Sequence, residues 1–210
     1  HDPCCGSGTI AIEAAQIACD IAPGLKRRFA FERLLPFVGD AQRAELQRLR
    51  SHAQARIHAS AVPIHASDVS FRMVDFARRN AQRAGVEAAI TFNGGDALER
   101  PAPELPADLP GTLMINPPYG ERIEVGGKAA RESAEDRDTP SDFFPRLSAH
   151  WKRAYTQHAA GWTAWVLSPD MKLPSAMRLK ESRRVPMWNG PIECRLFKFD
   201  LVAGSARNKV

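Results

Sequence analysis

The chain has 210 residues, of which 44% are hydrophobic and 25% charged, a composition typical of one globular domain with a sizeable core. No run of about eighteen apolar residues occurs, so the sequence indicates no membrane span. The formal net charge is +5, and residues 141–210 hold 12 Lys/Arg against 5 Asp/Glu. Such a basic C-terminal third suits a polyanionic partner such as RNA, although a solvated basic surface explains it equally well.

The four cysteines form no Cys-x-x-Cys pair, because Cys4 and Cys5 are adjacent and Cys19 and Cys194 stand alone. The histidines show no ligand spacing either, so we expect no metal site. Scattered thiols favour a reducing compartment, and we expect a cytoplasmic protein.

A glycine-rich turn opens the chain at residues 2–9 and leads into an Ala-rich helix over residues 10–18. In doubly wound folds such a turn anchors nucleotide-like ligands, since glycine lets the backbone approach them closely. The strand that should precede the turn is expected upstream of residue 1. We therefore interpret the chain as a fragment of a longer protein, forming a single domain over residues 1–210.

The next elements alternate between helix and strand. Residues 21–57 indicate a helical insertion packed on the body, with a helix that begins at Asp40. A strand over 62–68 ends in Asp68, and an amphipathic helix over 73–84 closes at Gly85. The following strand, 88–92, leads to Asp96.

The apolar run 113–115 predicts a buried strand that ends abruptly at Asn116, Pro117, Pro118 and Tyr119. In open parallel sheets, ligands lie at this carboxyl edge. The Asn116 side-chain oxygen and the Pro117 carbonyl can both accept hydrogen bonds from an exocyclic amine, and Tyr119 offers a ring for base stacking. The charged residues 121–139 predict a loop beside this site.

The remaining pattern predicts a helix from 140 to 155, a strand over 163–167, a short helix over 175–180, and a hairpin of strands 184–188 and 192–202. The fold class is therefore α/β: a doubly wound, Rossmann-like parallel sheet that ends in an antiparallel hairpin, with its first strand missing.

Several motifs together resemble the THUMP-associated class I methyltransferases. They are the turn at residues 2–9, Ala-Pro-Gly-Leu at 22–25, Phe-x-Phe-Glu at 29–32, and Asn-Pro-Pro-Tyr-Gly-Glu-Arg at 116–122. Residues 189–194 are similar to one branch, the bacterial large-subunit (23S) ribosomal RNA guanine-N2 methyltransferases. An upstream THUMP domain is not part of this chain, and in many bacteria a second methyltransferase domain follows in the same polypeptide.

The resemblance implies S-adenosylmethionine (SAM) as the cofactor and assigns roles to residues. Gly6 and Gly8 line its methionine end, with Asp2 near the amino group; Asp68 holds the ribose and Val69 flanks the adenine. Asp96 accepts from the adenine amine, beside Ala97. Asn116, Pro117 and Tyr119 hold the flipped guanine. Asp68 and Asp96 also fit a purely structural role as helix caps.

The basic residues Lys180, Arg183 and Arg184 are candidates for RNA phosphate contacts. Ribosomal RNA is the expected partner. Three alternatives remain open: a tRNA guanine-N2 or DNA adenine-N6 methyltransferase, a NAD-dependent oxidoreductase that uses Glu32 as the ribose acid, and an RNA-binding module without activity.

Overall fold

The structure is a computed structural model that describes residues 1–117 and 142–203. Its helices are α1 (Thr9–Ala18), α2 (Asp40–Ala55), α3 (Phe71–Ala84), α5 (Phe143–Ala154) and α6 (Leu173–Met177), with short 3-10 turns η1 (Ala30–Arg33), η2 (Leu35–Phe37) and η3 (Glu87–Ala89). Its strands are β1 (Ile64–Asp68), β2 (Ile90–Gly94), β3 (Gly111–Ile115), β4 (Trp162–Ser168), β5 (Arg183–Asn189) and β6 (Ile192–Leu201). Tyr119 and the loop expected over 121–139 lie outside the described residues.

The strands confirm the predicted fold class. β1 pairs with β2 in parallel, and β3 pairs with β4 in parallel, whereas β6 runs antiparallel to both β4 and β5. The order of the larger sheet is β3-β4-β6-β5, so the last strand of the chain lies between the two that precede it. The terminal antiparallel hairpin thus extends a parallel sheet, as the sequence predicts.

Two residues at the start of the chain join the two sheets. The Asp2 amide donates to the His65 carbonyl at 2.9 Å, and the Asp2 carbonyl accepts from the Ser67 amide at 2.9 Å. On the other side, the His1 carbonyl accepts from the Met114 amide at 3.0 Å, and the His1 amino group donates to the Thr112 carbonyl at 2.7 Å. The first strand was expected upstream of residue 1, whereas His1 and Asp2 themselves occupy the position between β1 and β3.

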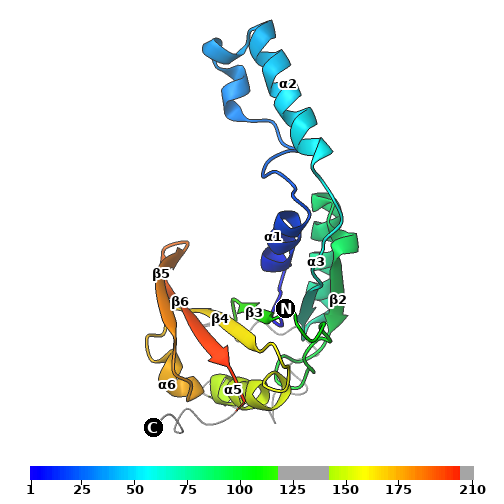
Figure 1. The fold of residues 1–210 in the computed structure, drawn as a ribbon. Coiled ribbons are helices and arrows are strands. Elements are labelled where there is room, and N and C mark those ends of the chain that lie inside the picture. The colour runs from blue at the N-terminus through cyan, green and yellow to red at the C-terminus, as the bar shows by residue number, and fades with distance from the viewer. Residues whose placement is uncertain (118–141, 204–210) are drawn as a thin grey trace.

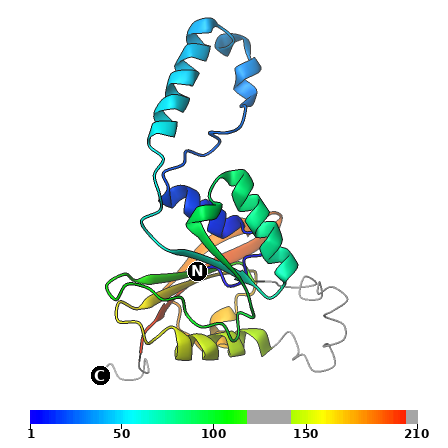
Figure 2. The same ribbon diagram turned by 90° about the vertical axis from the view of Figure 1, so that its right-hand side faces the viewer.

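Helices cover both faces of the sheet, as Figures 1 and 2 show: α1 and α3 lie on one side, α5 and α6 on the other. In α3 the spacing of Val74, Ala77 and Ala81 places all three on one buried face. The core on the side of α5 and α6 contains the fully buried Trp151, Tyr155 and Phe197, with other apolar side chains of these helices and of the larger sheet. Within the part of the chain that the structure describes, no helix has the length and apolar character required to cross a membrane.

Two details differ from the sequence-based expectations. The short helix expected over 175–180 lies earlier, at Leu173–Met177, where Pro174 favours the first turn and Arg178 ends it in a left-handed conformation with φ 49°. The insertion expected to pack on the body instead projects away from it (Figures 1 and 2). No side chain between Asp20 and His65 is buried, so this expectation is wrong.

The parallel pair β3–β4 depends on a glycine. Gly111 lies opposite Trp162, and a methyl group added to Gly111 would overlap the indole ring. Trp162 is only 4% exposed and packs edge-to-face on Tyr155 at 4.9 Å, so the ring has no free space to enter. We therefore expect Gly111→Ala to lower the free energy of unfolding by about 1–3 kcal/mol, measured by urea denaturation.

Gly94→Ala is the matched control for Gly111→Ala. A methyl group at Gly94 would also overlap a ring, that of Phe71, but Phe71 is 78% exposed and its side chain can turn into solvent. The Gly94 variant should retain nearly the full stability. Equal losses in the two variants would contradict the role assigned to Trp162.

Candidate functional site

The glycine-rich turn places backbone groups at the carboxyl edge of the sheet. Gly8 adopts φ +88° directly before α1, and a Cβ on it would lie 2.9 Å from the Cβ of Ala77. Only glycine therefore allows α3 to pack this close to the turn. Gly6 adopts φ +51°, and no atom lies within 4 Å of the position that its Cβ would take. The turn thus combines tight packing at Gly8 with an open approach to the backbone at Gly6.

Asp68 connects the glycine-rich turn to the ends of two strands. Its Oδ2 accepts from the Gly6 amide and its Oδ1 from the Ser70 amide, both at 2.9 Å. Its main-chain carbonyl accepts from the Gly95 amide at 3.0 Å, just beyond β2. A carboxylate has about four acceptor positions, so two remain available to a ligand. Asp68 is therefore not a cap of α3, whose N-cap is Ser70 without a side-chain cap bond; its structural role is to hold the Gly6 and Ser70 amides, and it retains capacity for ligand hydroxyls.

Asp2 is an acid buried beside the turn, with 3% of its surface exposed. Burial raises the pKa of its carboxyl group to about 7, and the nearby Asp68 charge adds to this rise. The hydrogen bond from the Cys4 amide at 3.2 Å and the neighbouring amino terminus act in the opposite direction but are smaller effects. A cationic group placed next to this carboxyl group would remove the cost of ionising it.

The other two strand ends complete the edge. Asp96 follows β2 and accepts from the Leu98 amide at 2.9 Å, while Ala97 is buried. Val69 follows β1 and is 61% exposed. Asn116 is exposed at the end of β3, and Pro117 behind it is buried. Along one sheet edge the order is therefore Asp96, Asp68, the glycine-rich turn and Asn116, so the structure brings these predicted residues together.

The basic candidates lie elsewhere. Arg183 and Arg184 open β5, which is three strands away from β3 across the larger sheet, and Lys180 precedes them. Arg184 pairs with Glu181 and lies over the Phe197 ring, with 5.1 Å from the guanidinium carbon to the ring centroid. The structure does not bring these three side chains to the strand ends. Their contact with RNA stays a prediction.

The sequence analysis did not single out Trp188 as a candidate residue. It is 65% exposed near the turn of the β5–β6 hairpin, which continues past the end of β4 on the same side as Asn116. A tryptophan directly before an Asn-Gly turn was the available signal. Such a ring offers a surface for stacking.

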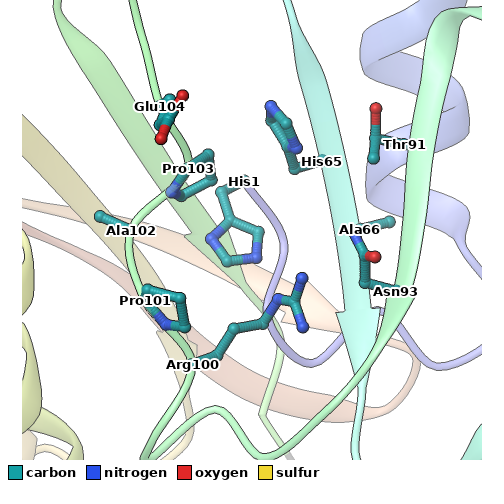
Figure 3. A pocket seen from close by; sticks show the side chains of 10 residues that line it. All are labelled: His1, His65, Ala66, Thr91, Asn93, Arg100, Pro101, Ala102, Pro103 and Glu104. Atoms are coloured by element: carbon teal, nitrogen blue, oxygen red, sulfur yellow. The ribbon is translucent and has the colours of Figure 1, made fainter.

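A separate cavity of about 310 Å³ lies on the face of β1 and β2 that is turned away from α1 and α3 (Figure 3). It is lined by His1, His65, Ala66, Thr91, Asn93 and residues 100–104. The Nε2 atom of His65 is buried there without a hydrogen-bond partner, and burial lowers the pKa of this imidazole. Neither Asp68 nor Asn116 belongs to this lining, so the cavity is distinct from the edge that holds them.

The described residues 1–117 and 142–203 contain no cluster of His, Cys, Asp or Glu that could hold a metal ion. All four cysteines are free, and Cys5, Cys19 and Cys194 are buried. Burial also raises the pKa of the Cys5 thiol to about 12, so this side chain is no nucleophile. Glu32, the acid that a nicotinamide site would require, lies in the projecting insertion, where it accepts from the Phe29 amide and pairs with Arg50.

Comparisons with known proteins identify the family to which this chain belongs. A family model described as "RMKL-like, methyltransferase domain" matches residues 1–198. The "Ribosomal RNA large subunit methyltransferase K/L" of Shewanella loihica is 37% identical over 98% of this chain, and the aligned part is 26% of that protein. The chain thus spans about a quarter of the length of such relatives.

Two solved structures are similar over nearly the whole chain. The putative methyltransferase SMU.472, complexed with SAH, superimposes with a TM-score of 0.75 and 28% identity over 98% of this chain and 48% of that one. A predicted N6-adenine-specific DNA methylase from Listeria monocytogenes gives a TM-score of 0.70 and 27% identity over 94% of this chain and 45% of that one.

Proposed function

Since the chain belongs to the RMKL-like methyltransferase domain family, we propose that it transfers a methyl group from SAM to the N2 amine of a guanine in large-subunit (23S) ribosomal RNA. The observation that carries the proposal is the sheet edge where Asn116 and the Pro117 carbonyl follow β3 directly beside the glycine-rich turn. The name of the Shewanella relative supports the ribosomal RNA substrate. Such an enzyme would act in the cytoplasm.

The residues at the edge fit SAM. The open space beside Gly6 admits a ligand against the backbone, and the buried carboxyl group of Asp2 suits the ligand's ammonium group. Asp68 and the exposed Val69 would contact the ribose and the adenine, with Asp96 and Ala97 beside them. The SAH complex of SMU.472 supports this choice over NAD. When bound, SAM supplies an electrophilic methyl group.

The chain's own task is to hold the target amine. A guanine within a duplex cannot enter such a site, so the base must be flipped out. The Asn116 Oδ1 atom and the Pro117 carbonyl each accept one N–H of the amine, which orients the nitrogen lone pair, and Tyr119 is proposed to stack on the base. The amine would lose one proton to water after the methyl group has been transferred, so no strong base is required and alignment provides most of the rate acceleration.

The direct test is nucleoside mass spectrometry of cells that lack the gene. We expect one N2-methylguanosine to disappear from large-subunit ribosomal RNA and to return when the intact gene is supplied. Unchanged ribosomal RNA together with loss of N6-methyladenine from DNA would instead support the activity named for the Listeria protein. Loss of N2-methylguanosine from tRNA would instead identify tRNA as the substrate.

Asn116→Ala should lower kcat for methyl transfer by about 100-fold or more, since the amine loses one of its two acceptors. SAH affinity, measured by isothermal titration calorimetry, should stay within about twofold because Asn116 contacts the base only. The control is Thr112→Ala, an exposed position on the same strand, which should retain both properties. Equal loss of transfer and SAH affinity in Asn116→Ala would make Asn116 a structural residue.

The raised pKa of Asp2 predicts a pH dependence for SAH binding. With a pKa of about 7, the carboxyl group is mostly neutral at pH 6 and mostly ionised at pH 8. Only the ionised form attracts the ligand's ammonium, so affinity should rise about tenfold over this interval. Asp2→Asn keeps the size of the side chain and stays neutral, so its affinity should match the wild type near pH 6 and remain flat. If the SAH affinity of Asp2→Asn rose with pH as steeply as that of the wild type, the titrating group would be a different one.

A further inference from the structure

The insertion, residues 21–57, forms an arm that extends from the body beyond α1 and α3 (Figures 1 and 2). The two ends of the arm lie side by side where it leaves the body, joined by a hydrogen bond from the His58 amide to the Cys19 carbonyl at 3.1 Å. Neither η1, η2 nor α2 contains a buried residue. Of residues 21–57, Ile21 at the base packs against the core of the body, whereas the rest of the arm adds nothing to that core.

The arm nevertheless has a defined shape. The Arg50 guanidinium on α2 donates to Glu32 Oε1 at 2.8 Å and to the Arg27 carbonyl at 3.0 Å. These bonds tie α2 to the segment that precedes it. Phe31 stacks on Phe29 with centroids 5.5 Å apart and meets Phe37 edge-to-face at 5.3 Å. The arm is thus a small unit held by one arginine and three aromatic rings.

The charge of the arm is strongly positive. Residues 21–57 contain 8 Lys/Arg and 3 Asp/Glu, which gives +5, the same as the net charge of the whole chain. On α2 this charge is largely neutralised, since Arg43 pairs with Asp40, Arg48 with Glu45 and Arg50 with Glu32. The excess is carried by the exposed segment before α2, at Lys26, Arg27, Arg28 and Arg33, for which the described part of the chain provides no ion pair.

Apolar side chains are exposed along the same segment. Phe31 and Phe37 are 37% and 43% exposed, and Leu34 and Leu35 are 55% and 88% exposed. Arginines interleaved with accessible aromatic rings match single-stranded RNA, whose phosphates bind the guanidinium groups and whose bases stack on the rings. A second copy of the chain fits less well, because two arms of charge +5 would repel each other.

We propose that the arm is a second RNA contact, in which Arg27, Arg28 and Arg33 bind phosphates and Phe31 and Phe37 stack on unpaired bases. This inference rests on the proposed function, since it assigns the arm to the same RNA that presents its base at Asn116. The arm leaves the body at the far end of α1, whose ten residues span about 15 Å from the glycine-rich turn. The sixteen residues of α2 add a length of about 24 Å. Only an RNA that extends tens of ångströms from the target base can reach both places.

The test compares two sets of substitutions on the arm. In the first, Arg27→Gln, Arg28→Gln and Arg33→Gln are combined; in the control, Arg43→Gln and Arg48→Gln remove arginines that already pair with carboxylates. Binding is measured by fluorescence anisotropy against a folded transcript of a large-subunit ribosomal RNA domain and against a short hairpin cut from it around the modified guanosine. Melting temperature and SAH affinity confirm that each variant is folded.

The triple variant should bind the long transcript about tenfold more weakly at about 0.15 M salt, with a salt slope reduced by roughly 0.7–0.9 for each phosphate that the arm no longer binds. Its affinity for the short hairpin and the affinities of the control variant should change less than twofold. Unchanged binding of the long transcript by the triple variant, or equal losses in both variants, would overturn the inference. The wild type is also examined by sedimentation. A wild-type dimer that is absent from the triple variant would overturn the inference and show that the arm binds a second copy of the chain.

Failure of the arm and failure of the proposed function give different results. If the arm does not bind RNA, the wild type still methylates both transcripts and the triple variant does so equally well. If the proposed function is wrong, neither transcript is methylated by any variant, and this result also overturns the arm's assignment to that RNA.

Discussion

The junction made by His1 and Asp2 is the contact on which the rest of the structure depends. Four hydrogen bonds link this two-residue segment to β1 on one side and β3 on the other. Without it, the parallel pair β1–β2 and the larger sheet would expose unpaired backbone groups to each other, each at the cost of an unmade hydrogen bond. The same segment leads directly into the glycine-rich turn, so the position of the site is fixed by the bonds that hold the sheet together.

This arrangement explains why the acids at the site are also structural. Asp68 holds the Gly6 amide and the Ser70 amide, and the buried Asp2 accepts from the Cys4 amide. Each carboxylate therefore stabilises the backbone conformation that a ligand needs before the ligand arrives. Such preorganisation reduces the entropy lost on binding. From the sequence, a helix-capping role and a ligand role of Asp68 were alternatives; the structure replaces the capping role by bonds to the Gly6 and Ser70 amides, and these bonds are compatible with the proposed ligand role.

The sequence predicted best those features that depend on local pattern. The helical spacing of Val74, Ala77 and Ala81 gave α3, and the proline after Asn116 marked the end of β3. It failed where the outcome depends on contacts distant in the chain. The leucines of α2 have the spacing of a buried face, yet the helix extends beyond the body and leaves Leu49 50% exposed. In the same way, strand order cannot be read from spacing alone, and the place of β6 between β4 and β5 puts Arg183 three strands from Asn116.

The acids of the site and the basic arm lie in different parts of the molecule. Asp2, Asp68 and Asp96 lie along the edge that would hold a sulfonium ligand, and carboxylates there favour a cation. The same carboxylates repel the phosphates of an RNA, so the edge cannot also supply its affinity for the backbone. Basic groups placed next to these acids would neutralise them and weaken the ligand site. At physiological salt the screening length is about 8 Å, so basic residues farther away than this attract RNA without disturbing the acids. The positively charged arm leaves the body about 15 Å from the glycine-rich turn. At this distance it can attract RNA and still leave the charge of the acids at the ligand site unchanged.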